Sequence, residues 1–274
     1  MIAETLIEAG RPERHYWREV WRYRDLLFFL SWRDIVVRYR QTAIGVAWAL
    51  LKPLLTVVIF TAVFGWVAKL PSEGEAPYAL MVLAGLLPWL FFASVVNEAG
   101  ASLVNNERIV TKTYFPRILV PGSAIAVCLV DFALSGLVLL GAFALYGVAP
   151  GARVLALPAF VLLAALAAAG PALLIAALNV RYRDVRFVVP FVLQLGLYLS
   201  PIGFSSSLIP ERWRLLYSVN PMAGVIDGFR WSLLPGTSEL YLPGVWLSLG
   251  ISLALLWAGL AYFRATERRI ADVI

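Results

Sequence analysis

Charged residues, cysteine and histidine are all scarce in this chain of 274 residues. Only 15% of the residues are charged, whereas 61% are hydrophobic, and the mean hydropathy is +0.80. This excludes an ordinary soluble domain, in which about 25% of residues are charged. The single cysteine, Cys128, excludes an intrachain disulfide, and the single histidine, His15, lacks the companions that a metal site needs. We therefore expect an integral membrane protein without a metal centre.

The sequence also lacks the motifs of nucleotide hydrolysis and of common hydrolases. Lys112 is the only lysine followed by serine or threonine, and the glycines of a phosphate-binding loop do not precede it. Neither HExxH nor G-x-S-x-G occurs. We expect a chain that is not an enzyme and binds no cofactor. If it drives active transport, ATP and Mg²⁺ must be bound by a separate ATPase subunit.

Long apolar runs are abundant, by contrast. Six of them match the roughly 20 residues that a helix needs to cross the hydrocarbon core. They are Ala43–Val67, Tyr78–Leu103, Ile118–Val148, Val154–Leu178, Phe187–Phe204 and Pro243–Phe263. The predicted fold is all-α, with six transmembrane helices in one domain over residues 42–264, preceded by an N-terminal segment over residues 1–41.

Most of the 23 basic residues lie on one side of these alternating crossings. They gather before the first crossing, between the second and third, between the fourth and fifth, and around the tail at residues 265–274. Because cytoplasmic loops hold the excess of lysine and arginine, both termini are predicted to be cytoplasmic. The net charge of +6 then reflects orientation and contact with anionic membrane lipids, and we expect no nucleic-acid partner.

The N-terminal segment carries an amphipathic stretch, Pro12–Leu30. Its large apolar side chains recur at helical spacing, and three arginines, Arg14, Arg18 and Arg22, form a row on another face. Such a helix is predicted to lie in the cytoplasmic interface of the membrane. It could serve as a plain anchor or as a docking surface for a partner.

Residues 105–117 form a polar and basic connection between two crossings. Asn106 is suited to cap a short helix, Glu107 suits the first turn, and Pro116 would end it. This predicts a short cytoplasmic helix. It is a candidate surface for a soluble partner, although many membrane loops contain basic helices of this kind.

Residues 205–242 are too apolar for a free loop. Pro210 suits the start of one helix, and Asn220 with Pro221 suits the cap and first turn of a second. In the second helix, Asp227 and Arg230 have the i, i+3 spacing of an ion pair. We predict a re-entrant helical hairpin, with an amphipathic surface hairpin as the alternative.

Two near-copies of one motif, Val37-Arg38-Tyr39-Arg40 and Val180-Arg181-Tyr182-Arg183, precede crossings. Because guanidinium groups suit phosphate oxygens, Arg38, Arg40, Arg181 and Arg183 are candidates to bind phosphate or a partner protein. Ordinary anchoring by positive charge is the alternative.

Few charges lie at membrane depth, namely Asp131, Lys52 and Glu98. No basic companion of Asp131 is evident in the sequence, so packing against a polar group of a neighbouring helix is favoured over a proton relay. Aromatic residues are abundant, and some could line a passage for sugars, whose C–H faces stack on rings. The candidates are Trp89, Phe92, Tyr198 and Phe204.

Several motifs occur in an order that resembles one transporter family. They are Arg33-Asp34 with Val37–Thr42, Lys52-Pro53-Leu54, Leu87-Pro88-Trp89, Tyr114-Phe115-Pro116-Arg117, Tyr182-Arg183-Asp184 and Asn220-Pro221-Met222. Together they resemble the permeases of polysaccharide ABC exporters, over roughly residues 32–232.

The resemblance implies a homodimer, joined by two copies of an ABC nucleotide-binding ATPase subunit in the bacterial inner membrane. The implied substrate is a polysaccharide linked to undecaprenyl diphosphate, of the O-antigen type, which moves from cytoplasm to periplasm. The four arginines would meet the diphosphate or the ATPase, and the four aromatic residues would line the substrate channel.

The resemblance also assigns the two connections. Residues 105–117 would form the cytoplasmic gate and coupling helix, with Glu107, Arg108, Lys112, Tyr114, Phe115 and Arg117 as candidates. Residues 205–242 would form the periplasmic gate, with Trp213, Asn220, Pro221, Asp227, Phe229 and Arg230 as candidates. An ABC exporter of drugs or small lipids is the alternative function, followed by a membrane scaffold that transports nothing.

Overall fold

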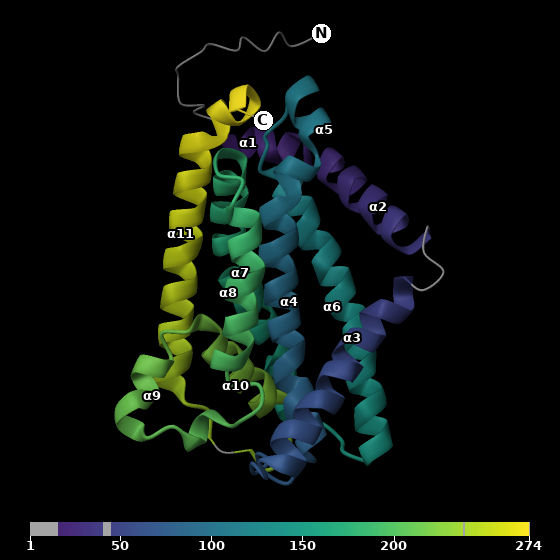
Figure 1. The fold of residues 1–274 in the computed structure, drawn as a ribbon, viewed down its shortest axis with the longest axis vertical. Coiled ribbons are helices and arrows are strands. Elements are labelled where there is room, and N and C mark those ends of the chain that lie inside the picture. Colours follow the sequence, from purple (N-terminus) through teal and green to yellow (C-terminus); the bar gives the residue numbers. More distant parts are fainter. Residues whose placement is uncertain (1–15, 41–44, 238, 274) are drawn as a thin grey trace.

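The structure is a computed structural model that describes residues 16–40, 45–237 and 239–273. Over these residues it contains helices and no strand, in agreement with the predicted all-α fold (Figure 1). The start of the predicted amphipathic helix, including Arg14, lies outside the described residues.

Four long helices form the body of the protein: α4 (Tyr78–Asn105), α6 (Leu119–Tyr146), α7 (Leu157–Arg181) and α11 (Leu242–Val273). In Figure 1, α4 stands at the centre, with α7 and α11 on one side and α6 on the other. The first half of α4 is buried, and Leu80, Met81 and Leu86 are fully inaccessible. This apolar helix is therefore the one around which the others pack.

Small residues allow α7 and α11 to approach closely. A Cβ atom on Gly259 would lie 2.2 Å from the carbonyl oxygen of Gly170, and a Cβ on Gly170 would lie 2.5 Å from the backbone of Leu255. Glycine at both positions thus brings the two backbones into contact, as is common between membrane helices.

Five helical segments of the described chain are long and apolar enough to cross a membrane: Leu50–Val67, Tyr78–Asn105, Leu119–Tyr146, Ala152–Arg181 and Leu242–Glu267. The first consists of α3 (Gly45–Phe60) and a π-helix, η1 (Thr61–Val67), and the fourth begins with a short 3-10 helix, η2 (Ala152–Ala156). They agree with five of the six predicted crossings.

The remaining predicted crossing, Phe187–Phe204, is represented by α8 (Val185–Leu199), which is apolar but shorter. The helix ends because Ser200 adopts an extended conformation (φ −89°, ψ 151°) before Pro201, and a residue before proline avoids helical angles. A sixth crossing therefore stays a prediction.

The N-terminal segment differs from the single helix predicted over Pro12–Leu30. It contains α1 (Tyr16–Arg22) and α2 (Arg24–Arg40), separated at Tyr23. Figure 1 shows α2 running obliquely down the side of the bundle, where it packs on α6. The predicted end at Leu30 was wrong, since α2 continues to Arg40 and the Leu30 side chain is buried in a hydrophobic cluster with residues of other helices.

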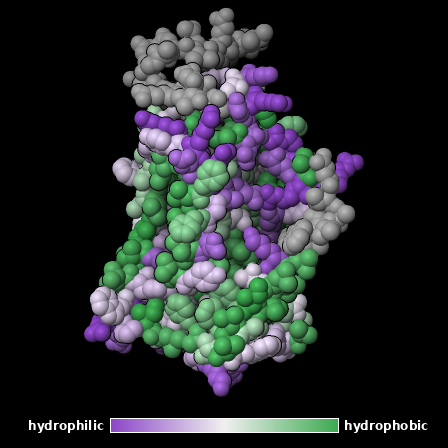
Figure 2. All heavy atoms as spheres, viewed as in Figure 1, coloured by the Kyte–Doolittle hydropathy of each residue, from purple (hydrophilic) through white to green (hydrophobic). Residues whose placement is uncertain are grey.

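The short helices lie at the two ends of the bundle (Figure 1). At one end, α5 (Glu107–Lys112) lies beside α1 and the end of α11; we call this the α5 end. At the opposite end, which we call the α10 end, η3 (Ser206–Leu208), α9 (Glu211–Tyr217) and α10 (Pro221–Leu233) form the predicted two-helix segment. In Figure 2, hydrophobic side chains cover most of the visible lower bundle, and hydrophilic ones gather toward the α5 end.

Two capping predictions had different outcomes. Asn220 caps α10 as predicted, because its Oδ1 atom accepts a hydrogen bond from the Met222 amide at 3.0 Å, and Pro221 is the first helical residue. Asn106 occupies the cap position of α5 but does not cap it with its side chain. Its Nδ2 atom donates to the Ser102 carbonyl at 2.9 Å, and its Oδ1 atom accepts from Arg33 at 2.8 Å.

Candidate functional site

An ionic cluster joins the end of α2 to the two helices beneath it. Arg38 donates to Glu98 of α4 and to Asp131 of α6, and the Tyr39 hydroxyl donates to Asp131. The expectation that Asp131 has no basic companion was therefore wrong. Its companion lies far away in the sequence, and the fold of α2 onto α6 brings the two together.

Tyr39 acts in this cluster as a neutral donor. Burial raises the pKa of Tyr39, and the hydrogen bond to Asp131 raises it further. The phenol therefore keeps its proton at neutral pH, and the carboxylate of Asp131 accepts bonds from two donors.

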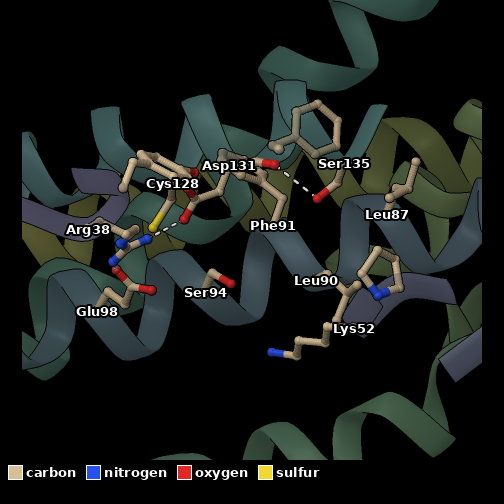
Figure 3. Close-up of a pocket in the computed structure, with 13 residues that line it drawn as sticks. Arg38, Lys52, Leu87, Leu90, Phe91, Ser94, Glu98, Cys128, Asp131 and Ser135 are labelled. Atoms are coloured by element: carbon tan, nitrogen blue, oxygen red, sulfur yellow. Dashed lines mark hydrogen bonds and ion pairs between the residues drawn. The ribbon is translucent and has the colours of Figure 1, made fainter. Parts of the chain in front are cut away.

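A pocket of about 290 Å³ adjoins the cluster. Apolar residues of α3, α4 and α6 form the rest of its wall (Figure 3). Its polar lining consists of Arg38, Tyr39, Glu98, Asp131, Lys52, Ser94 and Ser135. Lys52 of α3 is exposed and lines this pocket together with the three charged members of the cluster. All three charges predicted at membrane depth thus meet at one place.

The second copy of the arginine motif lies apart from the first. Arg181 ends α7, and Arg183 follows in the turn to α8, with both side chains exposed. In Figure 1, this turn and the end of α2 lie on opposite sides of α4. Arg40 is also exposed, whereas Arg38 is bound to two carboxylates. The four candidate arginines therefore do not form one site within the described chain.

A small hydrophobic core holds the α5 end together. Phe115, directly after α5, is buried with Leu30 of α2, Leu103 of α4 and Phe263 of α11. Arg117 secures the same region, since its amide donates to the Glu267 carboxylate at 2.7 Å. Glu107, Arg108, Lys112 and Tyr114 are exposed. The predicted coupling segment thus has a buried anchor and an exposed polar face.

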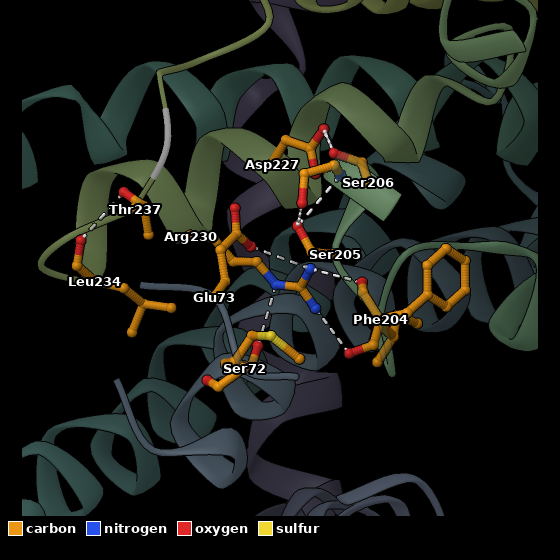
Figure 4. Close-up of polar contacts among 12 residues, drawn as sticks. Ser72, Glu73, Phe204, Ser205, Ser206, Asp227, Arg230, Leu234 and Thr237 are labelled. Atoms are coloured by element: carbon orange, nitrogen blue, oxygen red, sulfur yellow. Dashed lines mark hydrogen bonds and ion pairs between the residues drawn. The ribbon is translucent and has the colours of Figure 1, made fainter. Parts of the chain in front are cut away.

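At the α10 end, Arg230 is completely buried and acts as a clamp (Figure 4). Its guanidinium donates to the carbonyl oxygens of Met81 (3.2 Å), Phe204 (2.9 Å) and Ile202 (2.8 Å), and lies 3.6 Å from Glu73. It therefore joins α10 to the start of α4 and to the segment after α8. Sequence reasoning missed Glu73, which lies in a connection that carried no recognised motif.

The predicted pair of Asp227 with Arg230 was wrong. Asp227 accepts a hydrogen bond from Ser206 at 2.6 Å instead, because the Arg230 side chain extends toward α4 and the segment after α8. Burial raises the pKa of Asp227 to about 6. Of the other gate candidates, Phe229 is buried in the core and Trp213 is exposed.

The four aromatic candidates for a channel have different environments. Trp89 is buried and packs against α8, where a Cβ on Gly196 would lie 2.6 Å from its ring. Phe92 lies next to it, with ring centroids 5.4 Å apart. Tyr198 is exposed and stacks on Phe60, whereas Phe204 contacts Tyr217 near the Arg230 clamp. Trp89, Phe92 and Tyr198 thus share the region where α4 meets α8.

Comparison with known protein families identifies the family to which the chain belongs. The model of the ABC-2 type transporter family matches residues 25–234, from α2 to the end of α10. The chain belongs to the ABC-2 transporter family. The matched region contains the ionic cluster, α5 and the Arg230 clamp.

Individual relatives of this ABC-2 transporter chain match over nearly its whole length. It is 29% identical to an O-antigen export system permease protein of Klebsiella pneumoniae over 258 residues, which cover 91% of this chain and 95% of the relative. An O-antigen export system permease protein of Myxococcus xanthus is 28% identical over 94% of this chain and 98% of its own. A polysialic acid transport protein of Escherichia coli is 22% identical over 86% of this chain and 91% of its own.

Proposed function

We propose that this ABC-2 chain is the channel-forming permease of an ATP-driven exporter of lipid-linked polysaccharide. The proposed cargo is a polymer of the O-antigen type on undecaprenyl diphosphate, moved from cytoplasm to periplasm. The observation that carries the proposal is the near full-length similarity to two O-antigen export permeases. Because the sequence has no ATP-binding motif of its own, a separate ATPase would drive the transport.

In this proposal, the α5 end is cytoplasmic and receives the ATPase. Support comes from the exposed polar face of α5, which stands on a buried core that includes α2, α4 and α11. A force applied to α5 would therefore reach three other helices through Phe115 and Arg117. Exposed Arg40, Arg181 and Arg183 would attract the diphosphate, whereas Arg38 would position α2.

Two copies of the chain would enclose the channel, and α8 would complete six crossings. Support comes from the large apolar side chains that α3 and α8 leave exposed, among them Leu55, Val58, Phe187, Phe191 and Tyr198. These faces suit lipid or a second copy, and Tyr198 would then meet the glycan. The α9–α10 segment, held by the Arg230 clamp, would be the periplasmic gate.

Mass spectrometry of lipid-linked glycans after deletion of the gene tests the cargo. We expect a full-length polymer on its lipid diphosphate to accumulate on the cytoplasmic side, and expression of the intact chain to remove it. An unchanged glycan profile would contradict the proposal. ATPase activity of the purified complex that responds to small hydrophobic drugs instead would support a drug exporter.

Charge reversal on α5 tests the ATPase contact. We expect Arg108→Glu to lower co-purification of the ATPase at least fivefold, because the side chain lies on the exposed face of α5. Arg212→Glu is the matched control, since Arg212 is exposed on α9 at the opposite end. Equal recovery of the ATPase with both variants would remove α5 from the contact.

A further inference from the structure

We propose that the pocket between α2, α3, α4 and α6 binds the headgroup of a zwitterionic phospholipid, with phosphoethanolamine as the ligand class. This goes beyond the proposed export function, because the ligand is a lipid of the surrounding membrane and not the cargo. The pocket lies where Arg38, Glu98, Asp131 and Lys52 meet.

The charges of the pocket are separated into two parts. Arg38 is shared by Glu98 and Asp131, so that this cluster has a formal charge of −1. Lys52 supplies the opposite charge. It takes part in none of the ion pairs found among the described residues, all of which are made by arginines. A ligand with one cationic and one anionic group complements both parts, whereas a diphosphate would meet two carboxylates.

The order of the charges along the membrane matches the same ligand. Figure 3 shows Lys52 beside Leu90, with its ammonium directed toward the Ser94 side of the pocket, whereas Arg38 and Glu98 lie further along α4. Ser94 and Glu98 are one helical turn apart, about 6 Å along the axis. Glu98 is nearer the α5 end and Lys52 is deeper, at the start of the apolar segment Leu50–Val67.

A phosphoethanolamine headgroup has this order in a bilayer, since its phosphate lies closer to the acyl chains than its amino group does. The phosphate would accept from Lys52 and Ser94, and the ammonium would donate to Glu98 and Asp131. An ammonium with three N–H groups can make these bonds, but a trimethylammonium cannot. A charge at this depth is costly without a partner, and the lipid phosphate would supply one for Lys52.

The volume is compatible with a headgroup. The pocket volume of about 290 Å³ is close to the lower limit of small-molecule pockets, which is near 300 Å³. Leu87, Leu90 and Phe91 of α4 and Pro53 of α3 line the apolar part of the pocket, where the first carbons of the acyl chains would lie.

Native mass spectrometry of the full-length chain in complex with its ATPase tests the proposal. The probes are phosphatidylethanolamine, phosphatidylcholine and phosphatidylglycerol with identical dioleoyl chains. We expect phosphatidylethanolamine to bind most tightly, and Lys52→Gln to weaken it about tenfold, the loss of one charge-assisted hydrogen bond. Lys69→Gln is the matched control, because this exposed lysine lies outside the pocket lining, and it should change nothing.

A second pocket variant and a competing diphosphate provide two further tests of the proposal. If Lys52→Gln does not fold, Ser94→Leu, which fills the pocket without removing a charge, should lower the affinity for phosphatidylethanolamine instead. Equal affinity for the three lipids, or no effect of either pocket variant, would overturn the proposal. Displacement of phosphatidylethanolamine by farnesyl diphosphate, in a manner that requires Lys52, would assign the pocket to a diphosphate. Glycan export itself is tested separately, by the lipid-linked glycans that accumulate when the gene is deleted, so failure of the lipid proposal leaves that test unaffected.

Discussion

If Arg230 holds the α10 end together, its replacement should destabilise that end of the protein. Replacement by methionine, which is similar in length and uncharged, removes the donor to three carbonyl oxygens, two of them buried and one partly buried, and the partner of Glu73. A buried group left without its hydrogen bond costs about 1–3 kcal/mol, and breaking a buried ion pair costs about 3–5 kcal/mol. Because these losses overlap and water can enter, we expect a total of about 5 kcal/mol.

The assay is thermal unfolding of the purified protein, followed by limited proteolysis of residues 200–237. Arg230→Met should lower Tm by about 10 °C and expose the α9–α10 segment to cleavage. Arg153→Met is the control, since Arg153 is exposed at the same end, over the ring of Trp231 at 5.1 Å. A variant at Arg230 as stable and as resistant as the Arg153 control would refute the role of the clamp.

Two further predictions concern packing and pH. Gly259→Ala should destabilise the protein by about 1–3 kcal/mol, because its Cβ would lie 2.2 Å from the Gly170 carbonyl oxygen. Gly250→Ala in the same helix is the control, since its Cβ would have nothing within 4 Å. Thermal unfolding should show no change for this control. Burial raises the pKa of Asp227 to about 6, so its contribution to stability is complete below the unfolded pKa near 4 and is lost as pH rises through 6. At pH 7.5, Asp227→Asn should therefore be more stable than the unmodified protein, by up to about 3 kcal/mol in the free energy of unfolding, and should unfold at a higher temperature. At pH 4 the two proteins should unfold at nearly the same temperature, and the same difference at both pH values would contradict this.

Much of the helical architecture could be predicted from the sequence because membrane helices follow from length and apolarity alone. Five of the six expected crossings have counterparts of sufficient length. The two helices around Asn220 could also be predicted, since a cap followed by proline is a local signal. Local chemistry thus predicted the elements whose ends depend on neighbouring residues.

Tertiary contacts determined what the sequence did not reveal. Asp131 gains its basic companion only when α2 folds across α6. Leu30, where the helix was predicted to end, lies inside α2 and belongs to a buried cluster that includes residues of α4 and α11. Arg230 has a carboxylate at the predicted i−3 position, but the fold offers it three carbonyl oxygens from distant segments. For Asp131, Glu98 and Lys52 the sequence signal was their depth in the membrane, but only the fold shows that the three line one pocket.

The central claim is that this chain forms the passage for a lipid-linked polysaccharide, and transport in reconstituted vesicles tests it most directly. The chain and its ATPase would be inserted into vesicles that carry a labelled lipid-linked glycan in the outer leaflet, with an added glycosidase outside. The proposal predicts that ATP makes the glycan resistant to the enzyme, because it has moved inside. ATP hydrolysis by the complex with a glycan that stays fully accessible would contradict it.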